Sequence, residues 1–84
     1  MLIHHRQPFS SFGLLDYDQA PVGLFTVLSI NEPVGDCAAY QGVGPFNSDE
    51  AMIERIKAGG QKISEEDAKD RFPEIEEMGL RYRR

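Results

Sequence analysis

The chain has 84 residues and a formal net charge of −5, so it is expected to form one small acidic domain spanning residues 1–84. The negative charge argues against a general nucleic-acid binder, because such proteins present a basic surface to the phosphates. No apolar run approaches the roughly 20 residues that cross a bilayer, and the first residues lack the basic-then-apolar order of a signal peptide. The sequence therefore predicts a soluble, cytoplasmic protein without a membrane partner.

The number of cysteines and the size of the chain limit what can stabilise its fold. Cys37 is the only cysteine, so an internal disulfide is excluded, and a lone thiol fits a reducing compartment. A domain of this size buries only about 60–65% of its unfolded surface. Small domains commonly gain further stability from disulfides, metals or oligomerisation. With no disulfide and no recognisable metal pattern, the sequence favours oligomerisation.

Residues 1–46 are predicted to be mainly strand and loop, because they hold most of the aromatic residues, no lysine and a single arginine. Residues 2–7 form a candidate strand that Pro8 interrupts, since proline cannot donate a hydrogen bond to a neighbouring strand. After a loop, residues 14–18 are either a second short strand or an anchored loop.

The strongest strand signal lies in residues 24–30. One face carries Leu24, Thr26, Leu28 and Ile30, and the other carries Phe25, Val27 and Ser29. Both faces are largely apolar, which is typical of a strand covered on two sides, so we expect both to be buried. A turn leads to an antiparallel partner strand at residues 36–43, whose small side chains allow another backbone or a helix to approach closely.

Residues 47–84 are predicted to be mainly helical, since they carry eight of the nine basic residues and ten of the fourteen acids around helix-start and helix-stop signals. Asn47 or Ser48 can cap a first helix. Gly59 and Gly60 end it, the first glycine being suited to a left-handed cap.

A second helix is expected to begin after Ser64, whose hydroxyl can cap it. Pro73 ends this helix or begins a further helical turn that Gly79 closes. Residues 80–83 alternate apolar and basic side chains, which is the pattern of an edge strand.

Together these elements predict an α+β fold. A small antiparallel sheet of three to five strands in residues 1–46 is followed by two or three short helices packed on one face. The alternative is a small β-barrel with appended helices, because a glycine-rich, strongly bent hairpin suits barrel closure.

Five side chains in the first half are candidates for binding a ligand or a metal ion: His4, His5, Asp16, Asp18 and Cys37. Adjacent histidines in an extended segment point to opposite faces, so both cannot readily hold one metal ion. The spacing matches no metal pattern, and we predict no metal, no cofactor and no catalytic residue. The carboxylate next to Cys37 raises the pKa of its thiol, which argues against a nucleophile. Cys37 is better described as a small buried hydrophobe.

Three guanidiniums surround an aromatic ring in the last segment, which comprises Arg81, Tyr82, Arg83 and Arg84. Such a segment can bind an acidic protein surface or a nucleic acid. The simpler interpretation is a solvated end that balances an acidic domain. These four residues are therefore candidates for partner binding, and we expect no nucleic-acid binding at physiological salt.

The sequence favours a small non-catalytic interaction or assembly protein. The alternative is a small enzyme or ligand-binding protein that uses His4, His5, Asp16 and Cys37, and a weaker alternative is a nucleic-acid module that uses the arginine-rich segment. A homo-oligomer is expected, most simply a symmetric dimer, because the helices offer few apolar residues and can cover only one sheet face.

Overall fold

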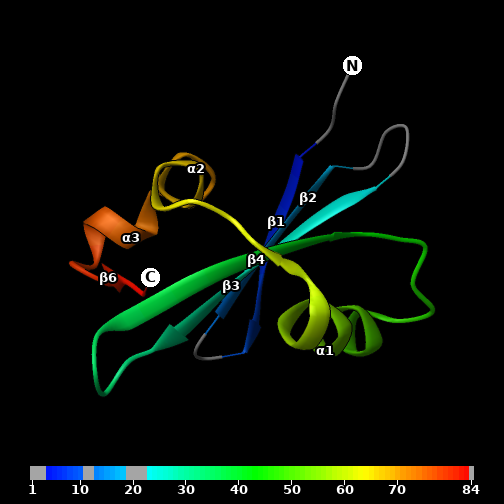
Figure 1. Ribbon diagram of the computed structural model, residues 1–84, viewed down its shortest axis with the longest axis horizontal. Helices are drawn as coiled ribbons and strands as arrows, with labels where there is room; N and C mark the ends of the chain where they lie inside the picture. The colour runs from blue at the N-terminus through cyan, green and yellow to red at the C-terminus, as the bar shows by residue number, and fades with distance from the viewer. Residues whose placement is uncertain (1–3, 11–12, 19–22, 84) are drawn as a thin grey trace.

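Figure 1 shows the computed structural model of the chain, which describes residues 4–10, 13–18 and 23–83. The elements are β1 (His4–Ser10), β2 (Gly13–Asp18), β3 (Leu24–Asn31), β4 (Asp36–Val43), α1 (Asp49–Gly59), β5 (Gln61–Lys62), α2 (Glu65–Arg71), α3 (Glu74–Glu77) and β6 (Arg81–Tyr82). Strands β1 to β5 pair antiparallel in chain order, and β6 pairs with β4 in parallel. The predicted α+β class is confirmed. Within these residues the sheet is open, so the barrel alternative is wrong.

The hairpin of β3 and β4 is the centre of the fold, as predicted. Val27 and Leu28 point to opposite faces of β3, and both side chains are fully buried. In β4, Tyr40 lies opposite Val27 and Ala39 lies opposite Leu28. The expectation that both faces of this strand are covered is therefore confirmed.

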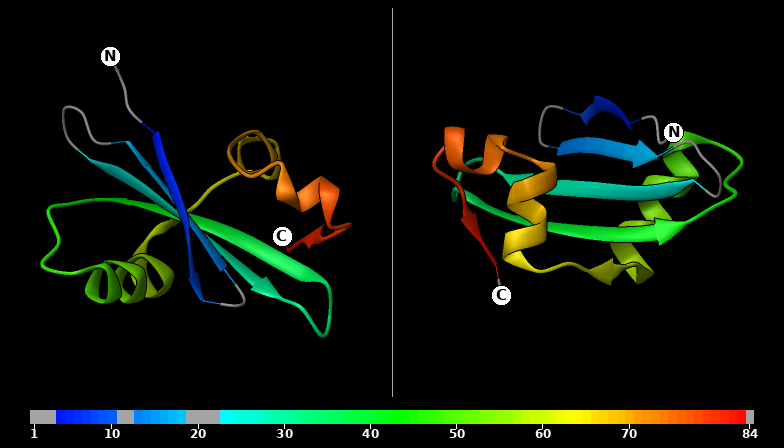
Figure 2. Two further views of the ribbon diagram at one scale, coloured as in Figure 1. Left: turned by 180° about the vertical axis from the view of Figure 1, so that it is seen from behind. Right: turned by 90° about the horizontal axis from the view of Figure 1, so that it is seen from above.

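The helices cover both faces of the sheet, so the expectation that they pack on one face is wrong (Figures 1 and 2). On one face, Met52 and Ile56 of α1 join the core cluster of Val27. On the other face, Phe72 at the end of α2 joins the core cluster of Leu28. The connection explains the arrangement: after α1, strand β5 runs along the edge of β4 and carries the chain round to the second face.

This arrangement removes one argument for a second subunit. The dimer prediction assumes helices on a single face of the sheet, whereas the chain provides helical layers for both faces. Oligomerisation itself stays a prediction. None of the helices in the described ranges is long and apolar enough to cross a bilayer.

A serine caps each of the two longer helices: Ser64 as predicted, and Ser48 from the predicted pair of Asn47 and Ser48. The Ser48 hydroxyl accepts a hydrogen bond from the N–H of Ala51 in α1, and the Ser64 hydroxyl accepts one from the N–H of Asp67 in α2. The end of α1 differs from the prediction, because Gly59 does not adopt a left-handed conformation. The glycine that matters is Gly60: a Cβ there would lie 2.5 Å from the carbonyl oxygen of Ile56 and 2.8 Å from that of Gln41. Close approach of two backbones therefore requires this glycine.

The edge strands also differ from the sequence expectations. β1 continues through Pro8 to Ser10, with a shift of register between these two residues. A proline is tolerated there because β1 is the outermost strand, where no second neighbour in the described sheet needs its hydrogen bond. β5 was not predicted at all, since two polar residues, Gln61 and Lys62, give no strand pattern.

Candidate functional site

The candidate site lies along the outer edge of β4, where three different groups meet its backbone. β5 pairs with Tyr40 and Gln41, and β6 pairs with Asp36 and Cys37. Ala39 lies between these two short ladders: its N–H donates a hydrogen bond to the hydroxyl of Tyr82, and its carbonyl oxygen accepts one from the N–H of Ile63. The edge is therefore closed by segments that come from opposite ends of the helical region.

The Tyr82 hydroxyl is held by backbone groups on both sides of the gap. It accepts a hydrogen bond from the N–H of Ala39 at 3.0 Å and donates one to the carbonyl oxygen of Ile63 at 2.6 Å. Burial raises the pKa of the Tyr82 phenol, and the hydrogen bond from Ala39 only partly opposes this effect. The hydroxyl therefore keeps its proton and acts as a structural link between β4 and the segment that begins α2.

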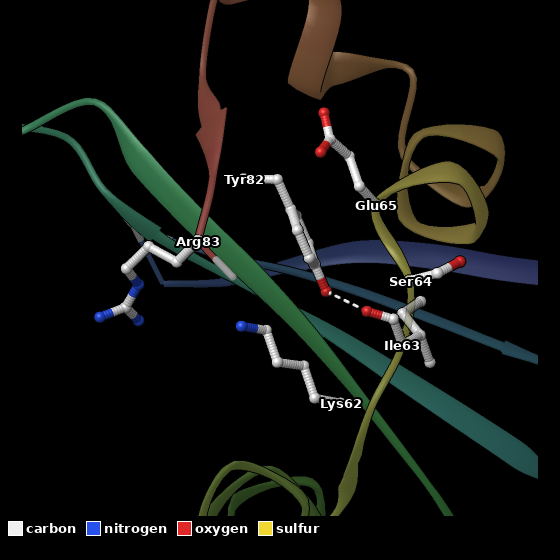
Figure 3. Close-up of a pocket in the computed structure, with 6 residues that line it drawn as sticks. All are labelled: Lys62, Ile63, Ser64, Glu65, Tyr82 and Arg83. Carbon is white, nitrogen blue, oxygen red and sulfur yellow. Dashed lines mark hydrogen bonds between the residues drawn. The ribbon is translucent and has the colours of Figure 1, made fainter.

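A pocket opens beside this link and is named here the edge pocket. It has a volume of about 530 Å³ and is lined by Lys62, Ile63, Ser64, Glu65, Tyr82 and Arg83. Figure 3 shows the Tyr82 ring standing between β6 and the start of α2, with the amino group of Lys62 and the guanidinium of Arg83 on the same side. The Lys62 amino group lies 5.5 Å from the centre of the Tyr82 ring, a cation–π distance.

Some charged side chains around the edge pocket form ion pairs, and others are exposed at its rim. The Glu65 carboxylate lies 3.1 Å from the amino group of Lys69, one turn further along α2. Arg81 directs its guanidinium to Asp36 at 3.5 Å. Lys62 and Arg83 are exposed at the rim. The rim is therefore locally positive, although the chain as a whole carries a net charge of −5.

The predicted partner-binding residues of the last segment have different positions in the structure. Tyr82 and Arg83 line the edge pocket, and Arg81 lies in β6 with its N–H donating to the carbonyl oxygen of Gly35 at 2.8 Å. Arg84 lies outside the described residues. The expectation of an edge strand at residues 80–83 is confirmed, so the segment is part of the sheet.

Cys37 lies in β4 with its side chain 1% exposed, on the face covered by α2 and α3. Burial raises the pKa of its thiol, and the negative charge of Asp36 raises it further. A buried, protonated thiol is a poor nucleophile. Its environment is that of a small apolar side chain.

Asp16 is buried in β2 and is held by an ion pair that sequence reasoning missed. Its carboxylate lies 3.2 Å from a guanidinium nitrogen of Arg71, at the end of α2. This pair ties α2 to the sheet. The register places Asp16 of β2 two strands away from β4 and four residues along the strands from Cys37. At the usual strand spacing and rise per residue, the two residues lie about 16 Å apart. The structure therefore does not bring these two candidates together.

The backbone register places His4 opposite Asp18 and His5 opposite Tyr17, in the pairing of β1 with β2. The side chains of His4, His5 and Asp18 lie outside the described part of the structure, so their use as ligands stays a prediction. Among the side chains that are described, no three of the His, Cys, Asp or Glu type gather closely enough to hold a metal ion.

Four residues of the edge pocket were not singled out from the sequence: Lys62, Ile63, Ser64 and Glu65. The cap at Ser64 was recognised, but the pairing that brings this segment to Tyr82 spans nearly twenty positions. The one available signal was the exposed lysine of a polar segment between two helices. Comparisons of the chain with protein-family models, with curated proteins and with solved structures found no match, so the site itself supplies the argument for function.

Proposed function

We propose that this chain is a non-catalytic, cytoplasmic interaction protein that binds an acidic segment of a partner protein in the edge pocket. One observation carries the proposal: two exposed cations, Lys62 and Arg83, lie beside an apolar wall made by Tyr82 and Ile63. Such a combination selects ligands of opposite charge.

The pocket's chemistry suits a short peptide segment with acidic groups next to one apolar side chain. Carboxylates would meet the ammonium of Lys62 and the guanidinium of Arg83, the latter with its fork of donors. An apolar side chain would pack on the Tyr82 ring. The volume of about 530 Å³ lies within the range of sites that enclose small groups.

The engagement of the pocket's phenol and carboxylate supports binding over catalysis. The Tyr82 hydroxyl is hydrogen-bonded to backbone groups at Ala39 and Ile63, and the Glu65 carboxylate is paired with Lys69. A general acid or base must be able to reach a substrate proton.

The buried thiol of Cys37 is compatible with a reducing compartment, which supports the cytoplasmic location.

The proposal is tested with a fluorescein-labelled pentapeptide that has one leucine between two pairs of glutamates, measured by fluorescence anisotropy. Matched variants are Lys62→Ala in the pocket and Lys57→Ala on α1, since each removes one exposed lysine. Because an exposed ion pair is worth about 0.2–1 kcal/mol, Lys62→Ala together with Arg83→Ala should weaken binding by about two- to thirtyfold. Added salt should weaken it further, since these charges are exposed.

Lys57→Ala should leave the affinity unchanged. Equal affinities for the Lys57→Ala protein and the protein with both Lys62→Ala and Arg83→Ala would show that the peptide does not use the edge pocket. A mixed-sequence RNA oligonucleotide is the second ligand, and we expect it not to bind at physiological salt. Tighter binding of the RNA than of the peptide would favour the nucleic-acid alternative.

A further inference from the structure

The structure contains a segment that matches the ligand chemistry of the edge pocket, and it belongs to this chain. Building on the proposed function, we infer that the acidic partner is a second copy of the protein, and that α3 of each copy binds in the edge pocket of the other. The result is a symmetric dimer in which each protomer completes the site of its partner.

The α3 end presents carboxylates next to an exposed apolar side chain. Glu76 and Glu77 are exposed, and the next residue, Met78, has 51% of its surface exposed. Large apolar side chains with this exposure are few in the described ranges: Val34, Val43 and Met78. The segment thus offers the acidic groups and the apolar anchor that the pocket requires.

Charge and polarizability both favour this match. The carboxylates of Glu76 and Glu77 are complementary to Lys62 and Arg83 at the rim of the pocket. Glu76 also lies 3.9 Å from Lys69 of its own chain, a long contact that leaves most of its side chain, 71%, exposed. The thioether of Met78 is suited to an aromatic ring, because sulfur makes favourable contacts with ring edges.

The two halves of the proposed contact lie at the same end of the molecule. α3 leads directly into β6, which supplies Tyr82, and the two elements lie beside each other in Figures 1 and 2. Val34, another exposed apolar side chain, lies at this end too, since its carbonyl oxygen accepts a hydrogen bond from Arg81. A two-fold axis near this end would bring each α3 to the other pocket, which is the requirement of a self-complementary interface.

The dimer is tested by light scattering after size exclusion, over a dilution series of the full chain. The wild-type protein should approach twice the 9.5 kDa chain mass at high micromolar concentration. Two charge reversals should each give a monomer: Lys62→Glu with Arg83→Glu in the pocket, and Glu76→Lys with Glu77→Lys on α3. Circular dichroism confirms that both proteins are folded, which the exposure of all four side chains leads us to expect.

Mixing the two reversed proteins is the decisive step. In the mixed dimer each pocket again faces an α3 of opposite charge, so the dimer mass should return. A wild-type protein that stays monomeric at high micromolar concentration while still binding the acidic pentapeptide would overturn this inference and leave the proposed function standing. A dimer that persists in both reversed proteins would overturn it as well.

Discussion

Replacing Leu28 by alanine tests whether the burial of the β3 face that α2 and α3 cover stabilises the fold. The Leu28 side chain is fully buried between α2 and the sheet, in one cluster with Phe72 and Ile75. Its cross-strand neighbour in β4 is Ala39, which is already small and cannot fill the space that the substitution leaves. Core leucine-to-alanine changes cost about 2–5 kcal/mol, and a site that cannot collapse lies in the upper part of that range.

The expected loss is large for a domain of this size. At about 0.05–0.15 kcal/mol per residue, a chain of 84 residues has a total stability of about 4–13 kcal/mol. Urea unfolding followed by circular dichroism should therefore show a clear fall in the midpoint, and the melting temperature should fall by at least about 8 °C. Val43→Ala, at a site 57% exposed on the same hairpin, is the control and should cost less than about 1 kcal/mol. A cost below about 0.5 kcal/mol for Leu28→Ala would refute the burial of this face.

Three further changes test individual contacts. Tyr82→Phe removes the hydroxyl that meets the N–H of Ala39, so it should destabilise the fold by about 1–3 kcal/mol in urea unfolding, and an unchanged midpoint would contradict the structural link. Gly60→Ala should destabilise by about 1–3 kcal/mol because its Cβ meets two carbonyl oxygens, whereas Gly59→Ala, with open space around it, should be neutral or stabilising by up to about 1 kcal/mol in the same assay. Because burial raises the pKa of the Cys37 thiol, its labelling by a disulfide reagent at pH 8 should be much slower in the folded chain than in urea, and equal rates would show that the thiol is accessible.

The sequence predicted those parts of the fold that depend on local patterns. An apolar run with two apolar faces located β3, and the turn after it located its antiparallel partner β4. Ser48 and Ser64 located the starts of α1 and α2, because capping is a contact over three residues. These signals are readable since the residues that make each contact lie close together in the chain.

The placement of the helices was not predictable in the same way. Which face α1 covers depends on the path of the connections around β4, and β5, which provides the return path, has only two polar residues. The apolar residues of the helices were correctly identified, but their division into two layers is a property of the whole topology. An apolar run with two apolar faces indicates that a strand is covered on both sides without indicating which segment covers each face.

The candidate site followed from the sequence only in part. The segment of residues 81–84 was identified by its composition, whereas the residues that meet it across the pocket were not. The role of the Tyr82 hydroxyl depends on meeting Ala39 at a distance of 43 positions in the chain. The Asp16 ion pair with Arg71 spans 55 positions and was missed for the same reason. Long-range polar contacts carry no periodic signal.

The central claim is that the edge pocket binds an acidic segment, and backbone amide shifts measured by NMR during titration with the leucine-containing pentapeptide test it most directly. The largest shifts should fall on residues 62–65 and 82–83, which line the pocket, while α1 on the opposite face should change little. Shifts concentrated on α1, or none at high peptide concentration, would contradict the account.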